Sequence, residues 1–208
     1  MDVQFHGANC ITITTKGTRI VVDDNLADFG AKGITKQDDV VLFTGAHTAP
    51  AVDTKLTIDH PGEYEVAGVS VYGIALRSHM DEAGNKGTTA YKFIIDDVRY
   101  FATGHVYPEL SERELEAIGT VDVLFVPVGG NGYTTDAIGA LKLIKKIEPR
   151  LVIPTNYDDA TLQFPVPQQT LEQALQNLSM EPLETTDKLR IKAAELPEGT
   201  HLVVLKRS

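Results

Sequence analysis

The sequence predicts an α/β fold in which two β-sheets pack together and helices lie outside them. Three observations indicate this class. The first half of the chain consists of short β-branched and apolar runs separated by turn residues. The second half mixes such runs with helical patterns. Between them, residues 121–156 follow the order strand, helix, strand. Strands first and helices later is the order expected of sheets with helices packed on their outer faces.

The strands expected in the first half begin with a hairpin. Cys10–Thr14 and Arg19–Val22 flank Lys16 and Gly17, a turn signal. A second hairpin is expected around Asp96 and Asp97. The other strands of this half are predicted from apolar runs at Val40–Phe43, Lys55–Ile58, Val69–Leu76, Tyr91–Ile95 and Arg99–Ala102.

The central segment predicts a βαβ unit. Val121–Val126 and Leu151–Ile153 are apolar runs typical of strands covered on both faces. Between them, apolar positions recur at helical spacing, which predicts a helix over 135–147 with Thr134 or Thr135 as its cap. The two strands should therefore be parallel neighbours. Their ends would deliver Asn131, Thr155, Asn156 and Tyr157 to the sheet edge at which open α/β folds place their sites.

Two further helices are predicted from capping boxes. Ser and Glu three residues apart open a helix over 111–118, and Thr and Gln three residues apart open another over 170–178. After the last helix, Leu189–Ile191 and His201–Leu205 are predicted to pair as edge strands.

Length and charge limit the function. With 208 residues the chain suits one domain with a sizeable core, or two small halves sharing one, and we expect a single domain over 1–208. The net charge of −10 argues against unaided binding to nucleic acid, which needs clustered Lys and Arg. The single cysteine, Cys10, fits a reducing compartment. The N-terminal residues lack a signal-peptide pattern and no apolar stretch could cross a bilayer, so we expect a cytoplasmic protein without membrane partners.

Three of the six histidines follow apolar runs and are candidate metal ligands. These are His47, His79 and His105. Three neutral imidazoles and a water form an acceptable catalytic zinc shell. The alternative is that each is a hydrogen-bonded loop histidine, and no tight His-x-His spacing distinguishes the two interpretations. The glycine-rich loop around Asn131 leaves a similar choice between an anion cradle and a structural loop.

The succession VVLFTGAHTAP, IDHPGEYEVAG, VRYFATGHVYPE and RLVIPTNYDD resembles the metallo-β-lactamase superfamily, in particular its small stand-alone Zn-dependent hydrolases. The resemblance runs from FHGANCITI to about Asp159. It implies a four-layer αββα sandwich of metallo-β-lactamase type, with a binuclear metal site at the edge between the two sheets.

The metal ligands that this resemblance implies are only partly present. The family's first motif, Thr-His-x-His-x-Asp-His, matches Thr44–Pro50, where His47 alone remains. His79 matches the next ligand, whereas His105 stands where the family has a bridging Asp. Asn156 replaces the last His. A binuclear centre is therefore not expected, because the missing residues contribute to both metal positions. Asp24 matches an Asp that follows a strand in family members and would position a ligand or hold its loop.

Two functions follow from these expectations. The first is a non-catalytic module that binds a small molecule, or interacts with a partner, on a hydrolase scaffold; Asp24, Asn131 and Asn156 are its candidate ligand-binding residues. The second is a mononuclear metal-dependent hydrolase, in which His47, His79 and His105 would hold one zinc or similar divalent ion. In the second case one outer ring nitrogen should meet a carboxylate, with Asp24 or Asp81 as the partner. The sequence reveals neither the substrate nor the oligomeric state.

Overall fold

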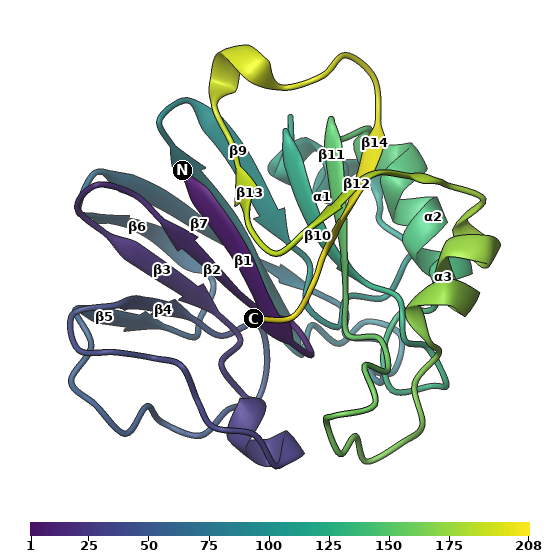
Figure 1. The fold of residues 1–208 in the computed structure, drawn as a ribbon, viewed down its shortest axis with the longest axis horizontal. Helices are drawn as coiled ribbons and strands as arrows, with labels where there is room; N and C mark the ends of the chain where they lie inside the picture. Colours follow the sequence, from purple (N-terminus) through teal and green to yellow (C-terminus); the bar gives the residue numbers. More distant parts are fainter.

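The computed structural model describes residues 1–208 and contains two β-sheets that enclose one large apolar core (Figure 1). The six-stranded sheet has the order β13-β1-β2-β3-β4-β5 and the eight-stranded sheet the order β12-β14-β11-β10-β9-β8-β7-β6. The strands of the first sheet are β1 (Asp2–Gly7), β2 (Cys10–Thr14), β3 (Arg19–Val22), β4 (Val40–Leu42), β5 (Leu56–Ile58) and β13 (Leu189–Arg190). The strands of the second are β6 (Gly62–Val66), β7 (Val69–Leu76), β8 (Thr88–Ile95), β9 (Val98–Ala102), β10 (Val123–Pro127), β11 (Leu151–Thr155), β12 (Pro182–Thr186) and β14 (His201–Leu205).

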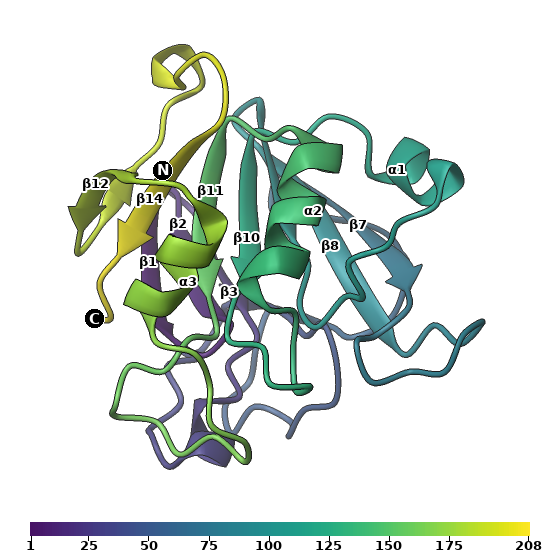
Figure 2. The same ribbon diagram turned by 90° about the vertical axis from the view of Figure 1, so that its right-hand side faces the viewer.

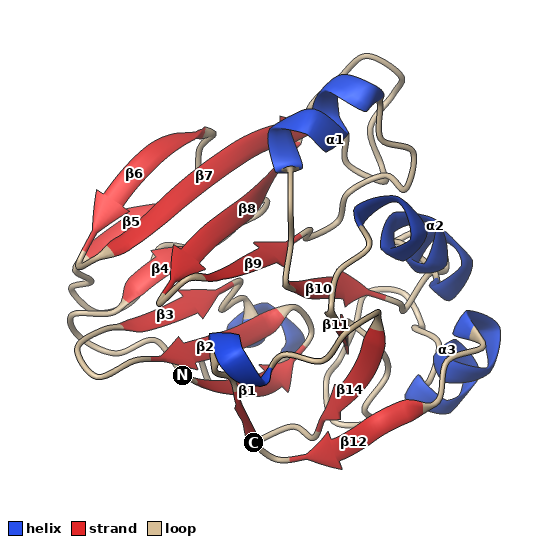
Figure 3. Cartoon of the chain, turned by 90° about the horizontal axis from the view of Figure 1, so that it is seen from above, coloured by secondary structure: helices blue, strands red, loops and turns tan.

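The helices are α1 (Glu112–Ile118), α2 (Ala137–Ile147) and α3 (Leu171–Leu178), with short 3-10 turns η1 (Leu26–Phe29) and η2 (Ala193–Glu195). Figure 2 shows α2 and α3 on the outer face of the eight-stranded sheet, in front of β10 and β11, and Figure 3 shows all three α-helices outside the sheets. None of the helices combines the length and the apolar character that a membrane crossing requires.

The six-stranded sheet is covered on both faces. Neighbouring residues of a strand point to opposite faces, so they belong to different clusters. Ile11 and Ile20 belong to the large core between the sheets. Cys10 and Val21, one residue away, belong to a smaller cluster on the other face, which Leu26, Phe29 and Leu162 complete. On this sheet the outer layer is therefore η1 and a loop, whereas α-helices form the outer layer of the eight-stranded sheet. The α/β sandwich predicted from the sequence is confirmed.

The central βαβ unit is confirmed as well. Strands β10 and β11 pair in parallel, with Phe125 opposite Ile153, and β9 pairs in parallel with the other side of β10. Parallel strands finish at the same edge of a sheet, so the residues that follow β9 and β11 lie close together. In the six-stranded sheet β3 and β4 are also parallel, so the residues that follow them meet in the same way.

Several details differ from the prediction. Strands β1 and β6 were not predicted. Asp136, not Thr134 or Thr135, caps α2, because both threonines are fully buried and the Thr135 hydroxyl donates to the carbonyl of Val106. The two closing strands do not pair with each other: β13 joins β1 in one sheet and β14 joins β11 in the other. The partner of β14 at the sheet edge is β12, which the sequence analysis did not predict. Its residues are mostly exposed, so its sequence lacks the apolar pattern of a buried strand.

Candidate functional site

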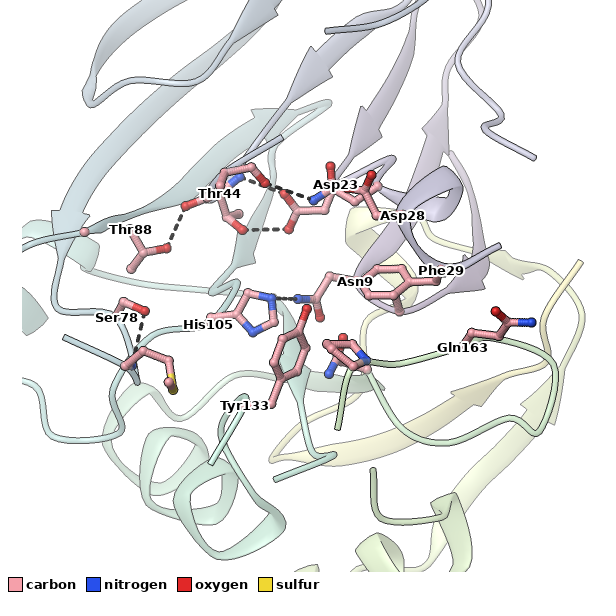
Figure 4. A pocket seen from close by; sticks show the side chains of 18 residues that line it. Asn9, Asp23, Asp28, Phe29, Thr44, Ser78, Thr88, His105, Tyr133 and Gln163 are labelled. Carbon is pink, nitrogen blue, oxygen red and sulfur yellow. Dashed lines mark hydrogen bonds between the residues drawn. The ribbon is translucent and has the colours of Figure 1, made fainter. Parts of the chain in front are cut away.

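A pocket of about 580 Å³ opens at the edge where the two sheets meet (Figure 4). Its walls come from loops that follow the parallel strands of both sheets and from the β1–β2 turn. The volume is in the range of small-molecule sites. The residues that line it are Ala8, Asn9, Asp23, Asn25, Asp28, Phe29, Thr44, Gly45, Ala46, Ser78, Met80, Gly87, Thr88, His105, Tyr133, Asn156, Gln163 and Pro165.

Three residues of the pocket wall have a left-handed backbone although they are not glycine. Ala8 has φ 47°, Asp23 φ 50° and Asn156 φ 50°. Such conformations are uncommon for residues with a side chain, least so for Asp and Asn, and they cluster at functional sites. The backbone N–H of Asn156 donates to the carbonyl of Ala8 at 2.6 Å. This bond ties the β1–β2 turn of one sheet to the end of β11 in the other. The pocket is therefore a place where the fold retains strained backbone.

A buried carboxylate lies at the end of β3. The carboxylate of Asp23 accepts hydrogen bonds from the amide and the hydroxyl of Thr44, both at 2.7 Å. Burial raises the pKa of Asp23 to about 6, although the two hydrogen bonds from Thr44 and the nearby His47 favour the charged form. Thr44 is held in turn by Thr88: the Thr88 hydroxyl donates to the backbone carbonyl of Thr44 at 2.6 Å. Asp23 thus lies in the pocket wall on a rigid, fully bonded support.

A second network crosses the pocket and orients the ring of His105. The Thr155 hydroxyl donates to Oδ1 of Asn9 at 2.8 Å, so the amide nitrogen of Asn9 faces Nε2 of His105, at 3.4 Å. An amide nitrogen only donates, so Nε2 accepts and the proton of the neutral ring is on Nδ1. Burial, with a smaller contribution from His79, lowers the pKa of His105 to about 4. The ring is therefore neutral near neutral pH.

His79 is a backbone neighbour of His105. Its amide donates to the carbonyl of His105 at 2.7 Å, and Ser78 and Val106 form an isolated antiparallel bridge beside it. The Nδ1 atoms of His79 and His105 are both enclosed by protein and have no hydrogen-bond partner. Unpaired buried polar atoms are rare in folded proteins and point to an unseen ligand, ion or water.

His47 does not join these two histidines. Its ring stacks on Phe43, with centroids 3.9 Å apart and planes 7° from parallel. Its Nε2 lies 3.6 Å from a carboxylate oxygen of Asp59, and its Nδ1 faces the carbonyl of Gly45 at 3.3 Å. His47 does not line the pocket. No group of three or more His, Cys, Asp or Glu side chains is arranged to hold a metal ion, so the predicted His47/His79/His105 centre is not assembled in this conformation.

The three predicted ligand-binding residues have different places. Asn156 lines the pocket, where its amide nitrogen donates to Gln168 at 3.1 Å. Asp24 lies outside the pocket wall and accepts hydrogen bonds from the amides of Ile34 and Thr35, at 2.8 and 2.7 Å, so it holds its own loop. Asn131 faces a separate polar hollow and donates to the carbonyl of Pro167.

Asp81, considered as a partner for a histidine ring, instead accepts from the amides of Ser78 and Gly87, both at 2.7 Å. Sequence reasoning missed Asn9, Thr44 and Thr88 as pocket residues. Asn9 had one local signal, its place in a two-residue turn between Gly7 and Cys10. Nothing local indicated that this turn would reach the end of β11.

The fold is an α/β sandwich of two β-sheets with helices outside. A family model described as the Beta-lactamase superfamily domain matches residues 2–156. This chain belongs to the β-lactamase superfamily.

Curated relatives and solved structures agree with this assignment. A UPF0173 metal-dependent hydrolase of Thermoplasma acidophilum is 25% identical over 195 residues, which cover 76% of this chain and 84% of the relative. A UPF0173 protein of Pyrococcus abyssi is 29% identical, covering 76% and 83%. A crystal structure from Thermotoga maritima, described as that of a Zn-dependent hydrolase of the metallo-β-lactamase superfamily, superposes with a TM-score of 0.79 at 24% identity, covering 99% of this chain and 98% of the other.

The relatives' names raise the question of whether this chain fits a divalent metal. Nδ1 of His79 is an unpaired buried nitrogen that suits a metal, whereas the unpaired Nδ1 of His105 carries the ring proton while Nε2 accepts from Asn9. A catalytic zinc centre needs three protein ligands, and no third His, Cys, Asp or Glu is placed beside them. Gly45, Ala49 and Pro50 have no ligating side chains, and the amide of Asn156 is bonded to Gln168. In this arrangement the donor set does not fit a catalytic metal centre.

Proposed function

We propose that this protein binds a small molecule in the pocket between the two sheets and holds no catalytic metal there. The observation that carries the proposal is the donor set: His79 and His105 lack a third ligand, because the ring of His47 stacks on Phe43 and pairs with Asp59. The pocket itself has a volume of about 580 Å³ and is lined by both polar and apolar groups. A scaffold that keeps the pocket but not the ligand set supports binding more than metal-assisted hydrolysis.

The polar groups of the pocket wall support the same proposal. Asn9, Thr44, Thr88 and Asn156 are buried and each is held by at least one hydrogen bond. Their side chains are neutral at any ordinary pH, so the wall offers fixed hydrogen-bonding groups without a metal. Such a wall can orient a ligand, which is the role of the few polar groups in most small-molecule sites.

The second candidate is a mononuclear metal-dependent hydrolase. It is supported by the enclosed Nδ1 atoms of His79 and His105, which lack partners, and by the names of the relatives. In this case His79 and His105 would bind the ion, His105 after its proton had moved from Nδ1 to Nε2, and a third ligand would have to move in. The metal would then supply an activated water as nucleophile.

Metal analysis separates the two candidates. The protein is purified without chelator and without a metal-affinity step, and its zinc, manganese and iron are measured against protein concentration. We expect far less than one equivalent of each. The unfolding temperature should be the same with and without EDTA, because a metal that is not bound contributes nothing to stability.

The matched variant is His79→Gln with His105→Gln, which removes both unpaired nitrogens. For the proposed function, added zinc should raise the unfolding temperature of neither the wild type nor the variant. A stoichiometric metal in the wild type, lost in the variant together with a zinc-dependent rise in unfolding temperature, would establish the hydrolase candidate instead.

A further inference from the structure

The charged groups of the pocket wall are all acidic. Asp23 and Asp28 line the pocket on the same side (Figure 4), and no Lys or Arg side chain lines it. Among the arginines near the pocket, Arg19 bonds to Asp39, Arg207 lies 3.2 Å from Asp159, and Arg77 donates to the backbone carbonyl of Asp81 at 2.9 Å. The chain as a whole carries a net charge of −10. A bound anion would therefore meet repulsion from the wall without a compensating cation, whereas a bound cation would be attracted.

Aromatic rings complete the wall. Phe29 and Tyr133 both line the pocket, and Tyr133 packs edge-on against His105 with ring centroids 5.2 Å apart. The faces of such rings attract organic cations. A metal cation is a poorer occupant, because no group of three ligating side chains exists and the volume of about 580 Å³ exceeds what one ion needs.

We propose that the pocket takes a small organic cation, an amine or amidine, which is attracted by the carboxylates of Asp23 and Asp28. The proposal rests on the proposed function, since it assumes that no metal ion occupies the pocket. It names the chemical class of ligand and predicts that anionic molecules of the same shape are rejected.

Three molecules of nearly one shape test the charge preference: benzamidine, benzamide and benzoate, which are cationic, neutral and anionic near neutral pH. Binding is measured by titration calorimetry on protein whose metal content has been determined. We expect benzamidine to bind at least about tenfold more tightly than benzamide, and benzoate more weakly still.

One variant and one control locate the binding. Asp28→Asn removes an exposed charge at the pocket and should weaken benzamidine about fivefold, as expected for one partly solvated ion pair. Asp187→Asn makes the same change of net charge on a side chain that is 80% exposed and outside the pocket, and should leave the affinity unchanged.

The possible failures can be told apart. Stoichiometric metal in the starting protein overturns the proposed function, whatever the ligands do. In metal-free protein, benzoate or benzamide binding as tightly as benzamidine overturns the charge preference alone. The same conclusion follows if benzamidine does not bind, or if Asp187→Asn weakens it as much as Asp28→Asn does.

Discussion

The amide nitrogen of Asn9 lies 3.4 Å from Nε2 of His105, and this contact joins the β1–β2 turn of one sheet to the end of β9 in the other. The Thr155 hydroxyl donates to the oxygen of the same amide, and this leaves the amide nitrogen facing His105. Asn9 is therefore a positioning residue: it determines which nitrogen of a neutral imidazole carries the proton in the pocket wall.

Asn9→Asp should reverse the tautomer of His105. The substituted carboxylate can only accept, so Nε2 would have to carry a proton, and the adjacent negative charge would raise the pKa of His105 from about 4. The ring nitrogen shifts in ¹⁵N NMR report both changes. The wild type should show the Nδ1–H form near neutral pH and the variant the Nε2–H form or the cation.

Thr155→Val provides the control for this experiment. Without the hydroxyl donor, the amide of Asn9 is free to turn over, so a mixture of the two tautomers is expected. If the wild type already contained the Nε2–H form, the network described for the pocket would be wrong.

The dependence of stability on pH should reveal two opposed groups. The folded pKa of Asp23 is about 6, above its ordinary value of 3.8, so between these values the folded state holds a proton that the unfolded state releases. This group makes the free energy of unfolding fall as pH rises through that window, at up to about 1.4 kcal/mol per pH unit. The folded pKa of His105 is about 4, below 6.5, so there the unfolded state binds the extra proton and the free energy of unfolding rises with pH.

Single substitutions should separate the two slopes. In Asp23→Asn only the histidine of the pair remains. The free energy of unfolding, measured with urea, should therefore rise from pH ~4 to pH ~6 more steeply than in the wild type. In His105→Gln only the carboxyl group of Asp23 remains, and the free energy of unfolding should fall as pH rises through the same window. Equal pH profiles for the wild type and both variants would show that neither group has the shifted pKa described.

Gly104 allows the end of β9 to lie against Thr44. A Cβ at Gly104 would lie 2.2 Å from the Thr44 hydroxyl oxygen, and the backbone there has φ +57°. Gly104→Ala should therefore lower the free energy of unfolding by roughly 3 kcal/mol, from overpacking and backbone strain together. The midpoint of urea unfolding measures the change.

Gly17→Ala is the matched control for that substitution. A Cβ at Gly17 meets nothing within 4 Å and its backbone is not left-handed, so a change of less than about 1 kcal/mol is expected. A mild effect of Gly104→Ala, comparable to the control, would mean that Thr44 and the support of Asp23 can shift readily.

Local patterns in the sequence predicted most of the fold. The helices at 111–118, 135–147 and 170–178 were predicted within one or two residues, because capping boxes and helical spacing act over a single turn. The parallel pairing of β10 with β11 followed from chain length between them. Strand β12 was missed since its residues are exposed and pair only through backbone.

The site could be placed from the sequence but not assembled. The pocket lies at the sheet edge that the sequence indicated, and Asn156 and His105 line it. His47 was misplaced because a position after a strand does not determine where a ring turns, and stacking on Phe43 holds it away. The bond between Thr155 and Asn9 joins residues 146 positions apart, which no local pattern encodes.

The most direct test of the account is the mass of the protein as it is purified, measured under native conditions with and without added benzamidine. The account predicts the mass of the bare chain, which shifts by one benzamidine as the cation is added. A species that carries one metal ion, retains it on dilution and loses it only to a chelator would contradict the claim that this pocket works without a metal.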